Sequence, residues 1–402
     1  MKRLSFRTAG ESHGRGLVAL LEGLPAGLSL EMVRDVDPDL KRRQGGYGRG
    51  RRMEIESDRA EVLSGIRLGE TIGSPVALVV WNKDSENWLE AMSPLPPDPD
   101  GNPKALRSLY LPRPGHADLV GLLKYDRRDT RDILERASAR ETAARVACGA
   151  VCKKLLADFG IGIGSHVTSI GPVETQVPHE LPEDLNSAVD ESPLRTLDDE
   201  AASSMIEAID QAKEEGDTLG GIFEVVVRGL PAGLGSYVSY DTKLDGRLAG
   251  AIMSIQAIKG VEIGVGFEGA RRLGSEVHDP ITTDESAPRA GGIGRSSNRA
   301  GGLEGGITTG ELLVVRAAMK PISTLRKRLP SVDMRDGSAK DAAVERSDVC
   351  AVPAAAVVGE AMVALVLADA FLEKFGGDAM SEVRRNFESY IAYLGERGYG
   401  AR

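Results

Sequence analysis

The sequence of 402 residues contains few cysteines, few histidines and few aromatic residues. Its three cysteines, Cys148, Cys152 and Cys350, form no C-x-x-C pair, and a chain of this length can bury a stable core without disulfides. The first two are four residues apart in a segment of helical pattern, which indicates buried free thiols. Phe, Trp and Tyr together make up only 4% of the chain. The low cysteine content disfavours a disulfide scaffold and favours a reducing, cytoplasmic compartment.

Long apolar runs are also missing from the sequence. Residues 354–372 form the most apolar stretch, but Glu360 and Asp369 interrupt it. No run approaches the roughly 18 apolar residues that a membrane-spanning helix needs. Residues 1–6 lack the apolar core of a secretory signal. We therefore expect no membrane partner.

Acidic residues outnumber basic ones, 60 to 50, so the formal net charge is −10. This charge disfavours general affinity for nucleic acid. The sequence has no nucleotide P-loop, no G-x-S-x-G pattern and no cluster of His, Cys, Asp and Glu with metal-ligand spacing. Residues 264–269 match G-x-G-x-x-G, but the next segment is too short for the helix of a dinucleotide-binding unit. We expect neither a nucleic-acid partner nor a metal.

Glycine, by contrast, is abundant, with 48 residues in the chain. The segment GLPAGL occurs twice, at residues 23–28 and 229–234, each time between a strand-like run and a helix-like segment. Either two similar turns arose by chance, or the chain contains two related halves. The second interpretation predicts one domain over residues 1–402, with halves near 1–200 and 215–402 related by a pseudo-twofold axis.

Hydrophobic periodicity predicts both helices and strands, without strict alternation. The predicted helices cover residues 31–43, 129–159, 244–258, 353–375 and 378–394. The predicted strands cover residues 17–21, 54–55, 76–81, 162–170, 222–227, 261–267 and 312–317. Residues 84–113 and 172–199 are interpreted as loops, and residues 291–310 contain too much glycine for a helix. The mixture favours an α+β fold over a doubly wound parallel sheet.

Arginines gather around the glycine-rich residues 45–48. The five arginines are Arg42, Arg43, Arg49, Arg51 and Arg52. They form either a solvated surface loop or a pocket for a small polyanion, because guanidinium groups match phosphate and carboxylate in geometry. We expect residues 42–52 and 291–310 to be mobile until anions bind, because ordering glycines costs entropy.

Two of the five histidines lie in glycine-flanked turns. His13 belongs to residues 10–14, GESHG, and His116 to residues 113–118, RPGHAD. Such histidines often cap turns at a surface. Together with an arginine cluster, they also suit acid–base work near neutral pH.

Eight motifs, in order along the chain, carry a resemblance to a known family. They cover residues 9–14, 46–50, 113–118, 135–142, 256–264, 298–306, 320–324 and 346–350. On these motifs the sequence resembles the chorismate synthases along nearly its whole length. The resemblance implies a lyase that converts 5-enolpyruvylshikimate 3-phosphate to chorismate and phosphate with reduced FMN (FMNH2). It also implies a single large α+β unit, with helices sandwiched between two antiparallel sheets and an internal pseudo-twofold.

The resemblance also implies the residues of the active site. His13 would protonate the departing phosphate, His116 would lie near flavin N1, and Asp348 would help flavin N5 to remove the C6 proton. Arg43 and Arg49 would bind substrate anions or, alternatively, an NADP phosphate. The FMN contacts would be Arg136, Ala137, Ser138, Gln256, Ala257, Gly305, Lys320, Pro321, Ile322, Ser323, Thr324 and Arg346.

One departure from the family, an expected assembly and two alternative functions complete the expectations. Many chorismate synthases have histidine where this chain has Ser347, so any contribution from a third histidine is in doubt. We expect a homotetramer that receives its reduced flavin from an external reductase. A flavin-dependent oxidoreductase that uses the same pocket, and a non-catalytic anion-binding or scaffold protein, are the alternative functions.

Overall fold

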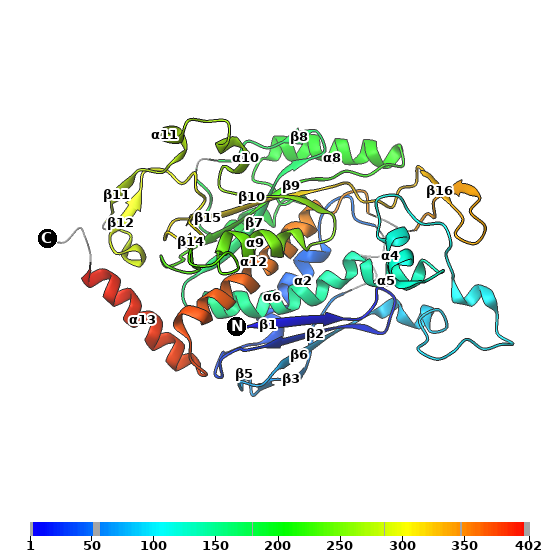
Figure 1. Cartoon of the computed structure of the whole chain (residues 1–402), viewed down its shortest axis with the longest axis horizontal. Coiled ribbons are helices and arrows are strands. Elements are labelled where there is room, and N and C mark those ends of the chain that lie inside the picture. Colours follow the sequence, from blue (N-terminus) through cyan, green and yellow to red (C-terminus); the bar gives the residue numbers. More distant parts are fainter. Residues whose placement is uncertain (1–2, 51–56, 179, 285, 346–347, 398–402) are drawn as a thin grey trace.

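The computed structural model describes residues 3–50, 57–178, 180–284, 286–345 and 348–397. Two antiparallel sheets enclose a layer of helices (Figure 1). The first sheet has the strand order β1 (Ser5–Ala9), β2 (Gly16–Glu22), β6 (Val76–Trp81) and β3 (Glu61–Ser64). The second has the order β10 (Ile258–Ile263), β15 (Leu313–Met319), β9 (Gly221–Arg228), β7 (Gly162–Ile170) and β8 (Val173–Glu174). This mixture of helices and antiparallel sheets is the predicted α+β class.

Two long helices form the middle layer. Helix α6 (Thr142–Ala157) packs on the first sheet, and α12 (Val352–Phe375) packs on the second and on α6. A methyl group added at Gly149 of α6 would lie 2.4 Å from the Cα of Ala361 in α12, so the two backbones approach very closely. Helices α2 (Asp37–Gln44) and α9 (Leu244–Met253) extend this layer.

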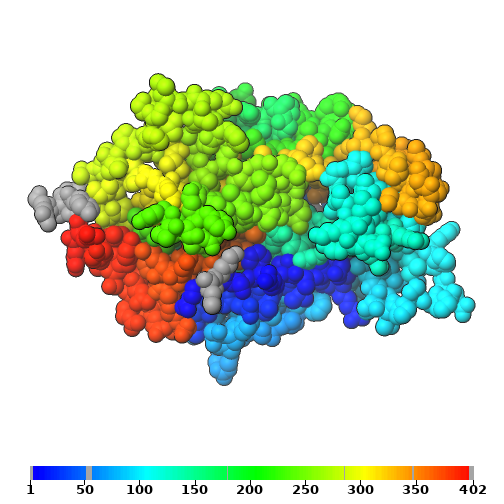
Figure 2. Space-filling view, viewed as in Figure 1, coloured from blue at the N-terminus to red at the C-terminus, as the bar shows by residue number. Residues whose placement is uncertain are grey.

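The remaining elements lie around this core (Figure 2). The other helices are α1 (Met32–Asp35), α4 (Asp118–Tyr125), α5 (Arg131–Ala137), α7 (Leu185–Val189), α8 (Asp199–Glu214), α10 (Gly266–Gly269), α11 (Gly274–Val277) and α13 (Met380–Glu396). The 3-10 turns are η1 (Lys83–Trp88), η2 (Pro103–Leu106), η3 (Ala139–Glu141) and η4 (Pro288–Ala290). The short hairpins are β4 (Ile66–Arg67) with β5 (Glu70–Thr71), β11 (Ile281–Thr283) with β12 (Ile293–Arg295), β13 (Leu303–Glu304) with β14 (Ile307–Thr308), and β16 (Pro330–Val332) with β17 (Ala339–Asp341).

Helix α12 is the one helix of the described residues that is long and apolar enough to cross a membrane. It is a core helix, because 94% of its most apolar window is buried inside the protein. It also carries two ionised residues in ion pairs, Glu360 with Arg42 and Asp369 with Arg247. The predicted helix over 353–375 is confirmed, with Pro353 in its first turn and Gly376 at its end.

The two sheets repeat one arrangement. Strands β1, β2, β6 and β3 correspond in order to β7, β9, β15 and β10. Thr71 Oγ1 donates to the proline carbonyl of the first GLPAGL turn at 2.6 Å and accepts from the N–H of its last leucine at 3.0 Å. Thr308 makes the same two bonds in the second turn, at 2.6 and 2.8 Å. We propose that residues near 1–200 and 215–402 are two related halves of one domain, and this matching of order and bonding supports the proposal.

Several predicted elements differ from the structure. The helix predicted over 129–159 is broken at Ser138, whose backbone is extended (φ −61°, ψ 141°) and whose Oγ accepts from the N–H of Arg140 at 3.2 Å. This local bond competes with the helix, as serine often does. The helix predicted over 244–258 ends at Met253, and helix α8 was not predicted. The strand predicted over 54–55 lies outside the described residues. Strands 76–81 and 162–170 are confirmed.

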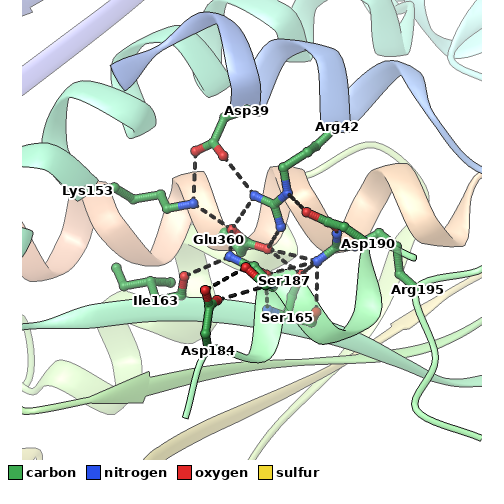
Figure 3. A network of polar contacts seen from close by, with 11 residues as sticks. Asp39, Arg42, Lys153, Ile163, Ser165, Asp184, Ser187, Asp190, Arg195 and Glu360 are labelled. Atoms are coloured by element: carbon green, nitrogen blue, oxygen red, sulfur yellow. Dashed lines mark hydrogen bonds and ion pairs between the residues drawn. The ribbon is translucent and has the colours of Figure 1, made fainter. Parts of the chain in front are cut away.

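A buried ion network joins the middle layer to the second sheet (Figure 3). Glu360 of α12 is 0% exposed. Its carboxylate accepts hydrogen bonds from Arg42 (2.7 and 3.0 Å), Lys153 (2.7 Å), Ser165 (2.6 Å), Arg195 (3.2 Å) and Asn186 (3.2 Å). Asp39 and Asp190 also pair with these cations, so three carboxylates balance three positive charges. Burial would raise the pKa of Glu360, but Lys153, Arg42 and Arg195 hold it well below its usual range.

Replacing Glu360 by glutamine should destabilise the protein by about 3–5 kcal/mol, because it leaves three buried cations with too little negative charge. The wild-type contribution is complete above the unfolded carboxyl pKa of about 4.3 and is lost as the pH falls below it towards the depressed folded pKa. Urea unfolding at pH 7 and pH 4 measures both effects. The matched control is Glu268→Gln, which removes an exposed pair with Arg272 and should cost at most about 1 kcal/mol. Equal losses in the two variants would contradict this account.

Candidate active site

His13 lies in the turn between β1 and β2, and a buried carboxylate holds it. The backbone N–H of His13 donates to Glu135 Oε2 at 2.9 Å, and its Nδ1 lies 2.9 Å from Glu135 Oε1. Arg131, one helical turn earlier in α5, donates to the same Oε1 at 3.1 Å. Burial would raise the pKa of Glu135, but its bonds to His13 and Arg131 lower it, so the carboxylate is charged. The carboxylate of Glu135 therefore fixes the Nδ1 side of His13.

Asn82 fixes the turn that carries His13. It directly follows β6, is 3% exposed, and donates from Nδ2 to the carbonyls of Gly14 (2.7 Å) and Glu11 (3.2 Å). Its Oδ1 accepts from Arg140 Nε at 2.9 Å. These three hydrogen bonds tie the turn to the end of β6 and to Arg140. The motif analysis missed Asn82; its only sequence signal is an amide residue at the end of an apolar strand.

His116 repeats the arrangement of His13. Its Nδ1 lies 2.5 Å from Asp118 Oδ1, and the Asp118 side chain is 1% exposed. Arg113 donates to both oxygens of Asp118, at 2.8 and 3.2 Å. Burial would raise the pKa of Asp118, but the hydrogen bonds from His116 and Arg113 hold it well below its usual range. The short contact assigns the Nδ1 proton to the bond with Asp118 and leaves Nε2 of His116 for a ligand.

The predicted flavin segment 320–324 lies against the His116 turn. Lys320 Nζ donates to the carbonyl of Gly115 at 2.5 Å, and Arg113 donates to Thr324 Oγ1 at 2.8 Å. Burial, with the nearby charge of Lys259, lowers the pKa of Lys320. Lys320 therefore brings a positive charge, without a carboxylate partner among the described residues, to the side of His116. Pro321, Ile322 and Ser323 lie within the same segment.

Gln256 and Ala257 follow α9 and form hydrogen bonds with Glu141 and Lys320. Ala257 has a left-handed backbone (φ +67°), which is uncommon for a residue with a side chain, and its carbonyl accepts from the N–H of Lys320 at 2.9 Å. Gln256 Nε2 donates to Glu141 Oε2 at 3.2 Å. Its Oε1 is buried and has no hydrogen-bond partner within the described part of the chain. A buried acceptor of this kind is costly unless a ligand donates to it.

The break between α5 and α6 carries the predicted residues Arg136, Ala137 and Ser138. Arg136 donates to the carbonyls of Thr8 (2.9 Å) and Gly10 (3.0 Å) in the first sheet. Ser138 Oγ lies 3.2 Å from the Oγ of Ser12, the residue before His13. The extended backbone at Ser138 thus turns its hydroxyl towards the His13 turn. The continuous helix predicted over 129–159 would have had no such break at Ser138.

Arg43 lies in α2 rather than in a loop, and its side chain is buried. It donates to Asp58 at 2.7 Å, and Arg140 donates to the same carboxylate at 2.6 and 2.7 Å. Burial and the nearby charges of Arg140 and Arg49 lower the pKa of Arg43 to about 10, although Asp58 opposes them. One carboxylate thus faces two guanidinium groups. The guanidinium of Arg49 is near enough to act on Arg43 as well.

Arg49 and Asp348 form a second group of predicted residues, and Gly305 lies in a separate turn. Arg49 pairs with Asp348 at 3.1 Å, and the N–H of Gly50 donates to Asp348 Oδ1 at 2.6 Å. Gly305 lies in the turn between β13 and β14 with φ +60°, beside Tyr237. Arg346, Ser347 and the predicted loop residues 51–56 lie outside the described residues. The expectation of one loop over 42–52 is wrong at its start, because Arg42 and Arg43 are helical.

Two cavities and one negative finding complete the description. A cavity of ≈ 270 Å³ is lined by His13, Trp88 and other residues of segment 85–95. A larger one of ≈ 560 Å³ lies between β7 and α7, and none of the predicted site residues lines it. Within the described residues, no group of three or more His, Cys, Asp and Glu side chains could hold a metal ion.

Comparison with known proteins agrees with the motifs. The family model described as chorismate synthase matches residues 4–372. The chain is 56% identical to a chorismate synthase of Symbiobacterium thermophilum, over 98% of this chain and 100% of that protein. It is 54% identical to "Chorismate synthase 1" of Bacillus cereus, over 98% of this chain and 100% of that protein. A crystal structure of a chorismate synthase has a TM-score of 0.78, 46% identity and 98% coverage of both chains. These findings confirm the predicted resemblance and fold class, and the chain belongs to the chorismate synthase family.

Proposed function

We propose that this enzyme, which acts at the chorismate-forming step of the shikimate pathway, performs an anti-1,4-elimination with the help of reduced FMN. The substrate is 5-enolpyruvylshikimate 3-phosphate; phosphate leaves C3, and a hydrogen leaves C6. The observation that carries the proposal is the pair of histidines, each with Nδ1 held by a buried carboxylate. Both turns also contact segments that the family resemblance assigns to FMN.

Substrate binding rests on the arginines. The substrate carries two carboxylates and a phosphate, and the guanidinium groups of Arg43, Arg140 and Arg49 are the neighbouring cations that would bind them. An anion near this cluster would reduce the repulsion between its guanidinium groups. Arg49, whose charge is close enough to lower the pKa of Arg43, would bind the same anions. An NADP phosphate is the alternative ligand of Arg43 and Arg49.

His13 is the proposed general acid. Glu135 holds the imidazole by Nδ1, and Nε2 would donate a proton to the departing phosphate. A protonated phosphate is the better leaving group. His116, held in the same way by Asp118, orients its Nε2 towards the flavin site. Asp348, bonded to Arg49 and to the N–H of Gly50, would assist removal of the C6 proton.

The residues present fit FMN. The buried Gln256 Oε1 offers an acceptor for a flavin N–H, and Lys320 offers a cation to the electron-rich ring or to the phosphate. Arg136, Ala137, Ser138, Ala257, Gly305 and Lys320–Thr324 would complete the contacts, together with Arg346. When bound, reduced FMN supplies electron density that helps the C–O bond to break. The protein itself orients the substrate, holds the protons at His13 and His116, and neutralises the anions.

We also propose a cytoplasmic homotetramer that obtains reduced flavin from an external reductase. The three cysteines are buried free thiols, which fits a reducing compartment. Exposed apolar side chains such as Tyr237, Val238 and Tyr240 offer surface for contact between subunits.

Under anaerobic conditions, the purified protein should release one phosphate per chorismate formed, with reduced FMN needed only in catalytic amounts. The reason is that the elimination is redox-neutral. Phosphate and chorismate are measured together against the amount of flavin. Consumption of one reduced flavin per turnover would instead support the oxidoreductase alternative, and no phosphate release would refute the lyase.

His13→Gln and His116→Gln should each lower kcat by about 10²–10⁴-fold, the usual contribution of a general acid–base group. The effect on KM should be smaller, because the arginines bind the substrate. His278→Gln, which changes a histidine outside both turns, serves as the control and should keep wild-type kcat. Wild-type kcat in either of the first two variants would contradict the role assigned to that histidine.

Lys320→Gln should weaken FMN binding by about tenfold, because it removes a charge-assisted contact worth about 1.4 kcal/mol. The dissociation constant is measured by flavin fluorescence at two salt concentrations, and the loss should shrink at high salt. Lys374→Gln is the matched control, because burial lowers the pKa of that lysine too. Lys374 lies at the end of α12, and its Nζ is placed over the ring of Tyr390. Equal effects of the two variants would argue against Lys320 as an FMN ligand.

A further inference from the structure

Trp88 is one of two tryptophans in the chain, and it lies directly on His13. The ring centroids are 3.8 Å apart and the planes are inclined by 26°, which is a stacked arrangement. Trp88 ends the 3-10 turn η1, at the start of the long irregular segment 82–113, cyan at the right of Figures 1 and 2. Long irregular segments inside compact domains are usually functional.

The indole of Trp88 is fixed on its other sides. Its Nε1 donates to Asp84 at 3.0 Å. The guanidinium of Arg107 lies over the ring, 4.0 Å from the centroid, and donates to the carbonyl of Asn87 at 2.9 Å. Arg131, which holds Glu135, also donates to the carbonyl of Arg107 at 3.1 Å. The same arginine of α5 therefore secures both the carboxylate at the edge of His13 and the segment that covers its face.

A cavity borders this stack. His13, Arg15, Ser85, Trp88, Leu89 and residues 92–95 line its ≈ 270 Å³. Its wall includes Leu89, Met92 and Leu95, so one side of His13 faces an apolar, partly enclosed space. Segment 82–113 thus builds part of the environment of the histidine, although it contributes no residue to the family motifs before Arg113.

The stack has an electrostatic consequence. The negative π face of an indole attracts a cation placed over it, so the stacked imidazole is stabilised in its protonated form. Glu135 acts in the same direction. Arg131, Arg15 and Arg107 oppose it, while Glu11 and Asp84 are the other carboxylates near the stack. Without the indole, repulsion from the three guanidinium groups would disfavour a positive charge on His13 more strongly.

We propose that Trp88 is a positioning residue for His13, whose indole face fixes the imidazole ring and stabilises its protonated form. This inference rests on the proposed role of His13 as the acid that protonates the leaving phosphate. It adds a second constraint to the ring: Glu135 fixes the edge, and Trp88 fixes the plane. Segment 82–113 would therefore support the proposed acid, His13, through Trp88.

Fluorescence tests the stack without any assay of catalysis. In Trp81→Phe, Trp88 is the only tryptophan; Trp81 is 53% exposed and pairs with Glu61, so its loss should leave the site intact. A protonated imidazole in van der Waals contact quenches indole emission. The emission of this variant should therefore fall as the pH is lowered through the titration of His13. Adding His13→Gln should abolish the change. A pH-dependent quench that survives His13→Gln, or no quench at all, overturns the proposal.

The pH–rate profile then tests the effect on catalysis. If His13 acts as an acid, kcat falls as the pH rises and the imidazole loses its proton. In Trp88→Leu this alkaline limb should move to lower pH by about half a unit to one unit, with KM changed less than kcat. Trp88→Phe, which keeps an aromatic face, should restore most of the shift, and Trp81→Phe should show none. Circular dichroism confirms folding of each variant.

The two experiments separate the two possible failures. An unchanged profile in Trp88→Leu, with the quench present in Trp81→Phe, overturns the positioning role of Trp88. A His13→Gln enzyme with wild-type kcat refutes the proposed acid instead, whatever the emission shows.

Discussion

The buried carboxylate of Glu360 is the interaction on which the other features depend. It ties α12 to α2 through Arg42, to α6 through Lys153, and to β7 through Ser165. Arg42 and Arg43 are neighbours in α2, and their side chains serve different purposes. Arg42 faces the Glu360 network, whereas Arg43 faces Asp58 and the proposed anion site. The network around Glu360 therefore also holds α2, and α2 carries Arg43, the proposed anion ligand.

The same physical device recurs around the active site. Buried carboxylates hold three of the groups that we propose as proton carriers or anion ligands: Glu135 holds His13, Asp118 holds His116, and Asp58 holds Arg43 together with Arg140. The carboxylates lie inside the protein, so their partners are oriented before a ligand arrives.

Sequence patterns identified those elements whose cause is local. Helix α12 was predictable because it is apolar on all sides and lies between Pro353 and Gly376. The break at Ser138 was not predicted, because the helical periodicity continues through it and hides the local bond of Ser138 to the N–H of Arg140. The second bond of this hydroxyl, to Ser12, joins residues that are far apart in the chain. Arg42 was predicted both at the end of a helix over 31–43 and at the start of a glycine-rich loop, and the structure has it in helix α2. Its ion pair with Glu360 was not predictable from local pattern, because the two residues are 318 positions apart. The motifs located both histidines, but the positions of Asn82 and Trp88 beside His13 exist only in the folded chain.

A crystal structure of the enzyme with FMN and 5-enolpyruvylshikimate 3-phosphate would test the central claim most directly: that two carboxylate-held histidines and the arginine cluster serve one site. The account predicts that Nε2 of His13 lies within hydrogen-bond distance of the phosphate ester. It also predicts that Nε2 of His116 contacts the flavin, and that the substrate anions lie at Arg43 and Arg49. A substrate bound away from His13, or a flavin bound away from Gln256 and Lys320, would contradict it.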